Sequence, residues 1–225
     1  MYNNIFTMTG SERAAVYALV ISFICYLASE GTIRAAGGKK AAVIQTRFLG
    51  FILLGIVPAA AVVVLTDFVP VSLGFGYKAG TAVFMLRWTA GLGLLVLMVT
   101  WIRSHSKEHP EQNPVMQDSL FINILSLVLY AAGYEGMFRG VVLFTAAGAF
   151  GLWPAVIISS VLYAAVNLPK GMEAAAGTFL FGPILGVVTL LTGSVWIAVA
   201  VHAVYTVSNA LFPLYNNKVM PVQKK

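Results

Sequence analysis

Long apolar runs separated by short polar connections dominate this sequence. Each run is close to the roughly twenty residues that a helix needs to cross a hydrocarbon core of about 30 Å. Lipid offers the backbone no hydrogen-bond partners, so these runs must be helical, and they lack the apolar and polar alternation of barrel strands. The pattern predicts an all-α, polytopic membrane bundle with seven spans, at 13–30, 48–66, 81–102, 119–150, 153–168, 173–192 and 194–212.

The fourth run is longer than one crossing needs, so we expect it to be tilted, broken, or divided into two helices joined near Gly133. The first run lacks a basic region at its start and ends at Ser29 and Glu30 without a small-residue cleavage pattern. We therefore interpret it as a retained span and not as a signal peptide. No linker, repeat or low-complexity tract divides the chain, which predicts a single membrane domain over 1–225.

Composition supports a membrane protein. The chain is 59% hydrophobic and only 10% charged, with a mean hydropathy of +0.86. That leaves too few polar residues to cover a soluble globule. Cys25 is the single cysteine, so neither a disulfide framework nor a cysteine metal cluster is expected.

The lysines and arginines predict the orientation of the chain, because cytoplasmic loops of membrane proteins are enriched in them. With seven crossings, Arg13 and Lys78 lie on one side, while Arg87 and Arg139 lie within spans. The other ten lie on the opposite side: Arg34, Lys39, Lys40, Arg47, Arg103, Lys107, Lys170, Lys218, Lys224 and Lys225. We therefore expect a multi-pass protein of the cell membrane with its N-terminus outside and its C-terminus in the cytoplasm. The net charge of +6 indicates contact with anionic lipid headgroups and requires no nucleic-acid partner.

A few polar residues inside the spans are the candidate functional groups, since an ionisable side chain in lipid costs at least about 2.5 kcal/mol. Glu135 and Arg139 lie four residues apart in the fourth span, on one helix face. Asn167 ends the fifth span, and His202 lies near the middle of the seventh. The predicted topology allows all of these groups to share one cavity.

Each of these residues also has a purely structural interpretation. Glu135 and Arg139 form a self-contained ion pair in that view. His202 hydrogen-bonds a neighbouring carbonyl, and Asn167 ends a helix before a turn. Tyr134 and Tyr163 are packing residues with a polar tip.

The order of three motifs favours a functional site. They are "YEGMFRG", "SSVLYAAVNLPKG" and "SVWIAVAVHAVYTVSNAL", within 119–212. This series resembles the CPBP family of intramembrane proteases, which includes the CAAX prenyl endopeptidases and the bacteriocin self-immunity proteins. In that family the first motif has two glutamates, three residues and arginine. The second has phenylalanine, three residues and histidine, and the third has histidine, three residues and asparagine or a similar polar residue.

The resemblance implies a core at 119–212 and assigns motif positions to particular residues. It implies that Glu135 is the second glutamate, Arg139 the arginine and His202 the third-motif histidine. Four positions depart from the pattern. Tyr134 replaces the first glutamate, Tyr163 the phenylalanine, Asn167 the second-motif histidine and Thr206 the asparagine.

Family members are thought to activate a water with a glutamate and a histidine and to hold the oxyanion with histidine and asparagine. Tyrosine is a poor base in place of the first glutamate. Asn167 retains the ability to donate a hydrogen bond to an oxyanion but cannot act as an acid or base. The resemblance leaves metal use open, but His202, Glu135 and an amide make a poor zinc ligand set, so no cofactor is expected.

Three functions remain. The first is a protein of this family with lost or altered peptidase activity that serves as a membrane scaffold, immunity factor or partner-binding protein. The second is an active, divergent endopeptidase with Glu135 as base. The third is a small transporter or channel, against which the lack of inverted repeats counts. The expected partners are the bilayer and a membrane protein or peptide.

Overall fold

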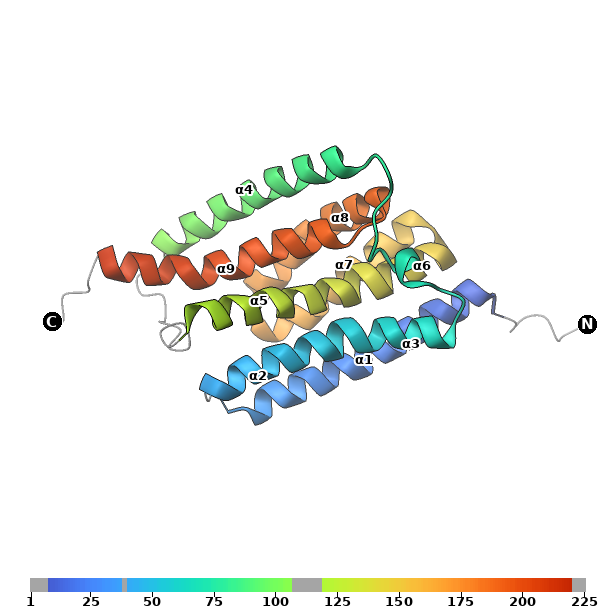
Figure 1. Ribbon diagram of the computed structural model, residues 1–225, viewed down its shortest axis with the longest axis horizontal. Coiled ribbons are helices and arrows are strands. Elements are labelled where there is room, and N and C mark those ends of the chain that lie inside the picture. The colour runs from blue at the N-terminus through green and yellow to red at the C-terminus, as the bar shows by residue number, and fades with distance from the viewer. Residues whose placement is uncertain (1–7, 38–39, 107–118, 220–225) are drawn as a thin grey trace, which may run out of the picture.

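The computed structural model describes residues 8–37, 40–106 and 119–219, which form a bundle of helices (Figure 1). The short helical turns Pro70–Leu73 and Leu168–Lys170 lie in connections. Two π-helical segments, Ile52–Ile56 and Gly136–Val142, interrupt longer helices. The α-helices are α1 Gly10–Ala35, α2 Lys40–Phe51, α3 Val57–Leu65, α4 Ala82–Ser106, α5 Leu120–Glu135, α6 Leu143–Phe150, α7 Leu152–Asn167, α8 Met172–Thr192 and α9 Trp196–Val219.

The predicted all-α membrane bundle is confirmed. Six described helices are long and apolar enough to cross a membrane, and Trp196–Phe212 is a shorter apolar helical segment at the position of the predicted seventh span. In Figure 1, α1 begins at one end of the bundle and α9 ends at the other. This agrees with an odd number of crossings.

The long fourth run is one continuous helix of 31 residues, Leu120–Phe150, and not two separate helices. Its irregular part is the π-helical segment between α5 and α6, where the backbone hydrogen bonds shift to residues five apart. The break therefore falls just after Glu135, close to the Gly133 position that the sequence indicated.

Glycines let α5 approach the other π-helical segment. A Cβ on Gly133 would lie 2.9 Å from the Cα of Phe51, and one on Gly55 would lie 3.1 Å from the Cα of Gly133. Any larger side chain at either position would separate the two backbones. This close packing fixes the helix that carries Glu135.

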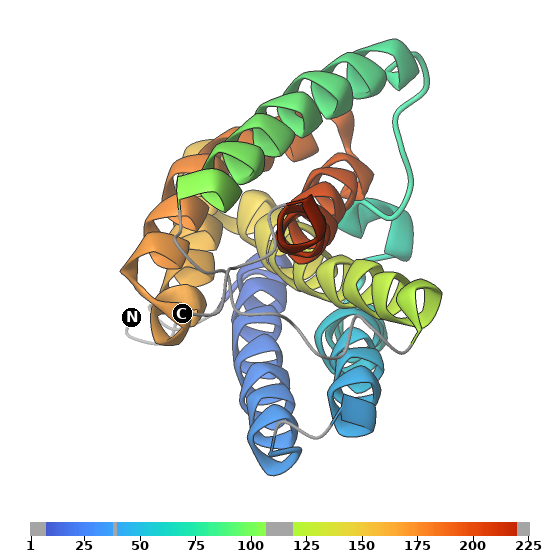
Figure 2. The same ribbon diagram turned by 90° about the vertical axis from the view of Figure 1, so that its left-hand side faces the viewer.

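Helix α9 runs through the middle of the bundle. Seen nearly end-on in Figure 2, it lies between α4 on one side and α5 on the other. It packs against both, while α7 packs on α8 and on the π-helical segment Gly136–Val142. The residues of α5, α7 and α9 are thereby brought to one place, halfway along the bundle.

Candidate functional site around Glu135, Tyr163 and His202

Glu135 and Arg139 form a buried ion pair. Both side chains are 1% exposed, and Arg139 Nε lies 3.5 Å from Glu135 Oε2. Beyond this ionic contact, Glu135 Oε2 and Arg139 Nε and Nη1 make no hydrogen bond with the described residues. The guanidinium also lies over the ring of Tyr163, 4.2 Å from its centroid. The pairing predicted from the four-residue spacing is therefore present.

The other carboxylate oxygen, Glu135 Oε1, meets two partners from different helices. His202 Nδ1 on α9 lies 2.8 Å from it, and the Tyr163 hydroxyl on α7 donates a hydrogen bond to it at 2.9 Å. The same hydroxyl lies 2.9 Å from His202 Nδ1. An ionised carboxylate only accepts hydrogen bonds, so we assign a proton to Nδ1 of His202. The three polar atoms form a nearly equilateral triangle.

Aromatic rings pack against this triangle, and the His202 side chain is 18% exposed. The rings of Phe138 and Tyr163 stack with centroids 4.5 Å apart and planes 3° from parallel. Tyr134 stacks on Tyr163 from 5.9 Å and faces His202 edge-on at 6.4 Å. Tyr134, Phe138 and Tyr163 are all buried. Packing of the Tyr163 ring against these neighbours therefore fixes the position of its hydroxyl.

Asn167 and Thr206 turn their polar groups to their own helices. The amide nitrogen of Asn167 donates to the backbone oxygen of Tyr163 at 2.9 Å. The hydroxyl of Thr206 donates to the backbone oxygens of His202 and Ala203. Among the described residues, neither has a hydrogen bond to Glu135 or to the His202 ring. The structure thus joins Glu135 and His202 but leaves Asn167 bonded one turn back.

Tyr134, at the position of the family's first glutamate, directs its hydroxyl away from the triangle. That hydroxyl accepts a hydrogen bond from Tyr130 at 3.4 Å and one from the Lys170 ammonium at 3.4 Å. The ammonium also lies over the Tyr134 ring, 4.7 Å from its centroid. A lysine near the end of α7 therefore anchors this tyrosine.

The donor set does not suit a metal ion. Within the part of the chain that the structure describes, no group of three or more histidine, cysteine, aspartate or glutamate side chains comes together. Glu135 and His202 are two donors, and a catalytic zinc site requires three protein ligands. We therefore derive no chemistry through a metal.

The sequence did not reveal what Tyr163 does. It predicted a packing residue at a position where the family has phenylalanine. The structure adds that its hydroxyl joins the carboxylate to the imidazole. The available signal was the substitution of phenylalanine by tyrosine, which adds one hydroxyl that needs a hydrogen-bond partner when it is buried.

Fold and site together define a polytopic α-helical membrane protein in which buried Glu135 and Tyr163 cluster with a partly exposed His202. Residues 116–208 match the family described as type II CAAX prenyl endopeptidase Rce1-like. Over this segment the chain is similar to the CAAX-protease family, and the match covers the three motifs that indicated the resemblance. Comparison with curated proteins and with solved structures gives no significant match.

Proposed function

We propose that this intramembrane protease-like protein lacks peptidase activity and serves as a membrane scaffold, immunity factor or partner-binding protein. The observation that carries the proposal is the Tyr163 hydroxyl, 2.9 Å from both Glu135 Oε1 and His202 Nδ1. That is the position from which a nucleophilic water would contact both groups.

General-base catalysis needs a water within about 2.6 to 3.2 Å of the base. At Glu135 Oε1 this distance is taken by an oxygen that is covalently part of the protein. Packing favours this position of Tyr163, because its ring stacks on Phe138 and lies beneath the Arg139 guanidinium. Glu135 Oε1 and His202 Nδ1 therefore contact the tyrosine hydroxyl at the position that a nucleophilic water would need.

Two further substitutions support the loss of activity. The second-motif histidine is replaced by Asn167, whose amide is bonded to its own helix. The first glutamate is replaced by Tyr134, whose hydroxyl is bonded to Tyr130 and Lys170. Among the described residues, no carboxylate other than Glu135 and no imidazole other than His202 contacts the triangle.

The test is a peptidase assay on the purified protein in detergent and in liposomes. Substrates are prenylated and unprenylated membrane-proximal peptides, because nothing favours one over the other. We expect no cleavage by the native protein, whereas an active family member in the same assay cleaves. Restoring the family pattern with Tyr134→Glu, Tyr163→Phe and Asn167→His is expected to produce measurable cleavage.

A second candidate is a divergent endopeptidase with Glu135 as base. It is favoured by the 2.8 Å contact between Glu135 and His202, which is suited to an assisted carboxylate base. It predicts that the native protein cleaves one of these peptides and that Glu135→Ala and His202→Ala abolish cleavage without loss of folded protein. That result would overturn the proposal of an inactive protein.

We also propose that the end of the bundle at which α9 ends faces the cytoplasm. The last turn of α1, which contains Arg34, and the turn from α7 to α8, which contains Lys170, lie toward this same end (Figure 1). Cytoplasmic loops carry an excess of such residues. The N-terminal end of α1 then faces the outside of the cell membrane.

A further inference from the structure

An apolar groove runs along the side of the bundle. Its volume is about 620 Å³, and its lining is almost wholly apolar. One wall is α3 with the π-helical segment before it, and the other wall is α5 with the start of α9. Its lining includes Phe51, Ala60, Val64, Leu129, Ala132 and Val199.

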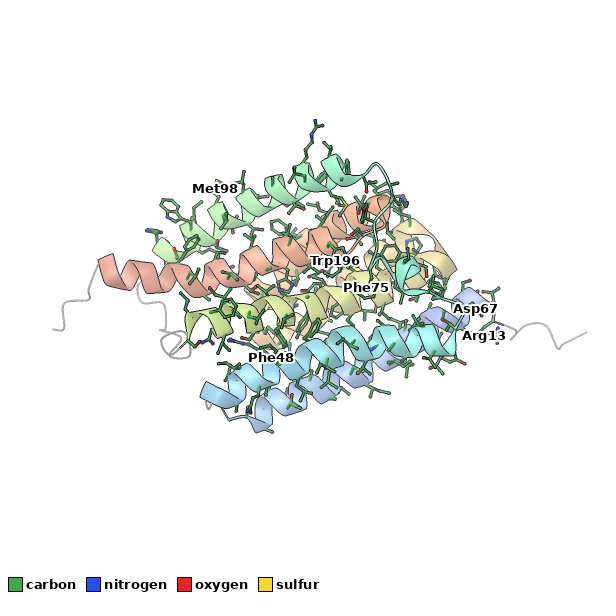
Figure 3. The ribbon with its side chains drawn as sticks, viewed as in Figure 1. Arg13, Phe48, Asp67, Phe75, Met98 and Trp196 are labelled. Carbon is green, nitrogen blue, oxygen red and sulfur yellow. The ribbon has the colours of Figure 1, made fainter. Side chains whose placement is uncertain are left out.

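The outer end of the groove lies beside Trp196. Figure 3 shows Trp196 near Phe75, between α9 and the connection that follows α3. The indole nitrogen of Trp196 donates to the backbone oxygen of Phe75 at 3.1 Å. This bond fixes the connection against α9 and closes that end of the groove.

A cation marks the opposite end. Arg47 lies one helical turn before Phe51 and extends the first wall beyond the groove. Ser126 lies three residues before Leu129 and extends the second wall in the same way. Arg47 Nη1 contacts Ser126 Oγ at 3.4 Å, which joins the walls. Arg47 is half-buried, and no carboxylate among the described residues pairs with it. A half-buried cation that pairs with none of the described carboxylates, in a helix long enough to span the membrane, requires an explanation.

The shape of the groove suits one hydrocarbon chain. From Phe51 to Val64 the wall is about 20 Å long at about 1.5 Å per residue. The volume spread over that length corresponds to a cross-section of roughly 30 Å², whereas a helix with its side chains is about 10–12 Å across. A partner helix is too wide to enter, and a single acyl chain is not.

We propose that the groove and Arg47 form a binding site for one anionic phospholipid. An acyl chain lies in the groove between α3 and α5, and the headgroup phosphate accepts hydrogen bonds from the Arg47 guanidinium. Arginine is well suited to phosphate because its planar fork donates two parallel hydrogen bonds. Arg47 also lies toward the cation-rich end of the bundle, which favours an anionic headgroup. This inference does not depend on whether the protein cleaves peptides.

Native mass spectrometry of the delipidated protein in detergent tests the proposal. The probes are phosphatidylglycerol and phosphatidylcholine with identical acyl chains, and glycerol phosphate without chains. We expect one phosphatidylglycerol per chain, bound more tightly than phosphatidylcholine, and no competition from glycerol phosphate. Arg47→Gln is expected to weaken phosphatidylglycerol binding about fivefold, the usual effect of one basic residue near a lipid surface.

Two variants separate the site from general charge and from loss of fold. Arg34→Gln removes an exposed positive charge at the same end of the bundle and is expected to leave binding unchanged. Ala60→Phe narrows the groove from an exposed position and is expected to weaken both phospholipids, with thermal stability kept. Equal binding of the two phospholipids, or the same loss from Arg34→Gln as from Arg47→Gln, overturns the proposal. So does a dimer that forms with no lipid retained, because a second copy would then cover the groove.

Discussion

Replacing Arg139 by methionine removes the countercharge of Glu135 while keeping much of the side-chain volume. Both partners are 1% exposed, and the charged atoms are 3.5 Å apart. Two unit charges at that distance attract by about 5 kcal/mol at an effective dielectric constant of about 20. The loss also leaves a carboxylate buried without a cation, and breaking a buried pair on one side typically costs about 3 to 5 kcal/mol. We therefore expect Arg139→Met to lower the free energy of unfolding by about 3 kcal/mol.

The assay is reversible unfolding in mixed micelles, followed by circular dichroism or tryptophan fluorescence. In the double variant Glu135→Gln with Arg139→Met, neither charge of the pair is left without its partner. Its loss of unfolding free energy is therefore expected to be smaller, by about 1 kcal/mol or more, than the sum of the losses in the two single variants. Arg87→Met, at an exposed position on α4, is the control and is expected to change stability by about 0.5 kcal/mol or less. Additive losses within about 0.5 kcal/mol would refute the reasoning, because the two side chains would then not interact.

Two other predictions concern packing and orientation. A Cβ on Gly182 would lie 2.9 Å from the Cβ and Oγ of Ser160, so Gly182→Ala is expected to lower the free energy of unfolding by about 1 to 3 kcal/mol in the same assay. The control Gly177→Ala places its Cβ in open space and is expected to leave the free energy of unfolding unchanged. Equal effects of the two substitutions would contradict the close contact between α7 and α8. In a background without the native cysteine, a membrane-impermeant thiol reagent is expected to label Tyr77→Cys in intact cells and Arg34→Cys only after permeabilisation, and the reverse pattern would invert the proposed topology.

The spans could be predicted from the sequence because a membrane helix needs a fixed length of apolar residues. The same reasoning placed Glu135 and His202 in the middle of their helices, and the structure brings them into contact. Family motifs supplied the pairing that periodicity alone does not give. The side-chain direction of Asn167 was beyond this reasoning, because an amide at a helix end bonds equally well to its own backbone or across a cavity.

The groove and the place of Arg47 at its end could not be predicted from the sequence either, and the physical reason is a different one. The groove is lined in part by the π-helical segment Ile52–Ile56, which approaches α5 at Gly55 and Gly133, and the hydrophobic pattern contains no signal for a π-helical turn. Arg47 was interpreted only as one of ten positive charges on one side of the membrane. Its place at the end of the groove follows from the packing of α2 on α5, which determines what it contacts.

The position of the Tyr163 hydroxyl tests the central claim most directly. High-resolution density maps of the native protein and of Tyr163→Phe, both in lipid, would show which oxygen contacts Glu135 and His202. We expect the tyrosine oxygen about 3 Å from both groups in the native protein, and a water at the same position in Tyr163→Phe. A native map in which a water bridges Glu135 and His202, with the tyrosine turned away, would contradict a site closed by its own side chain.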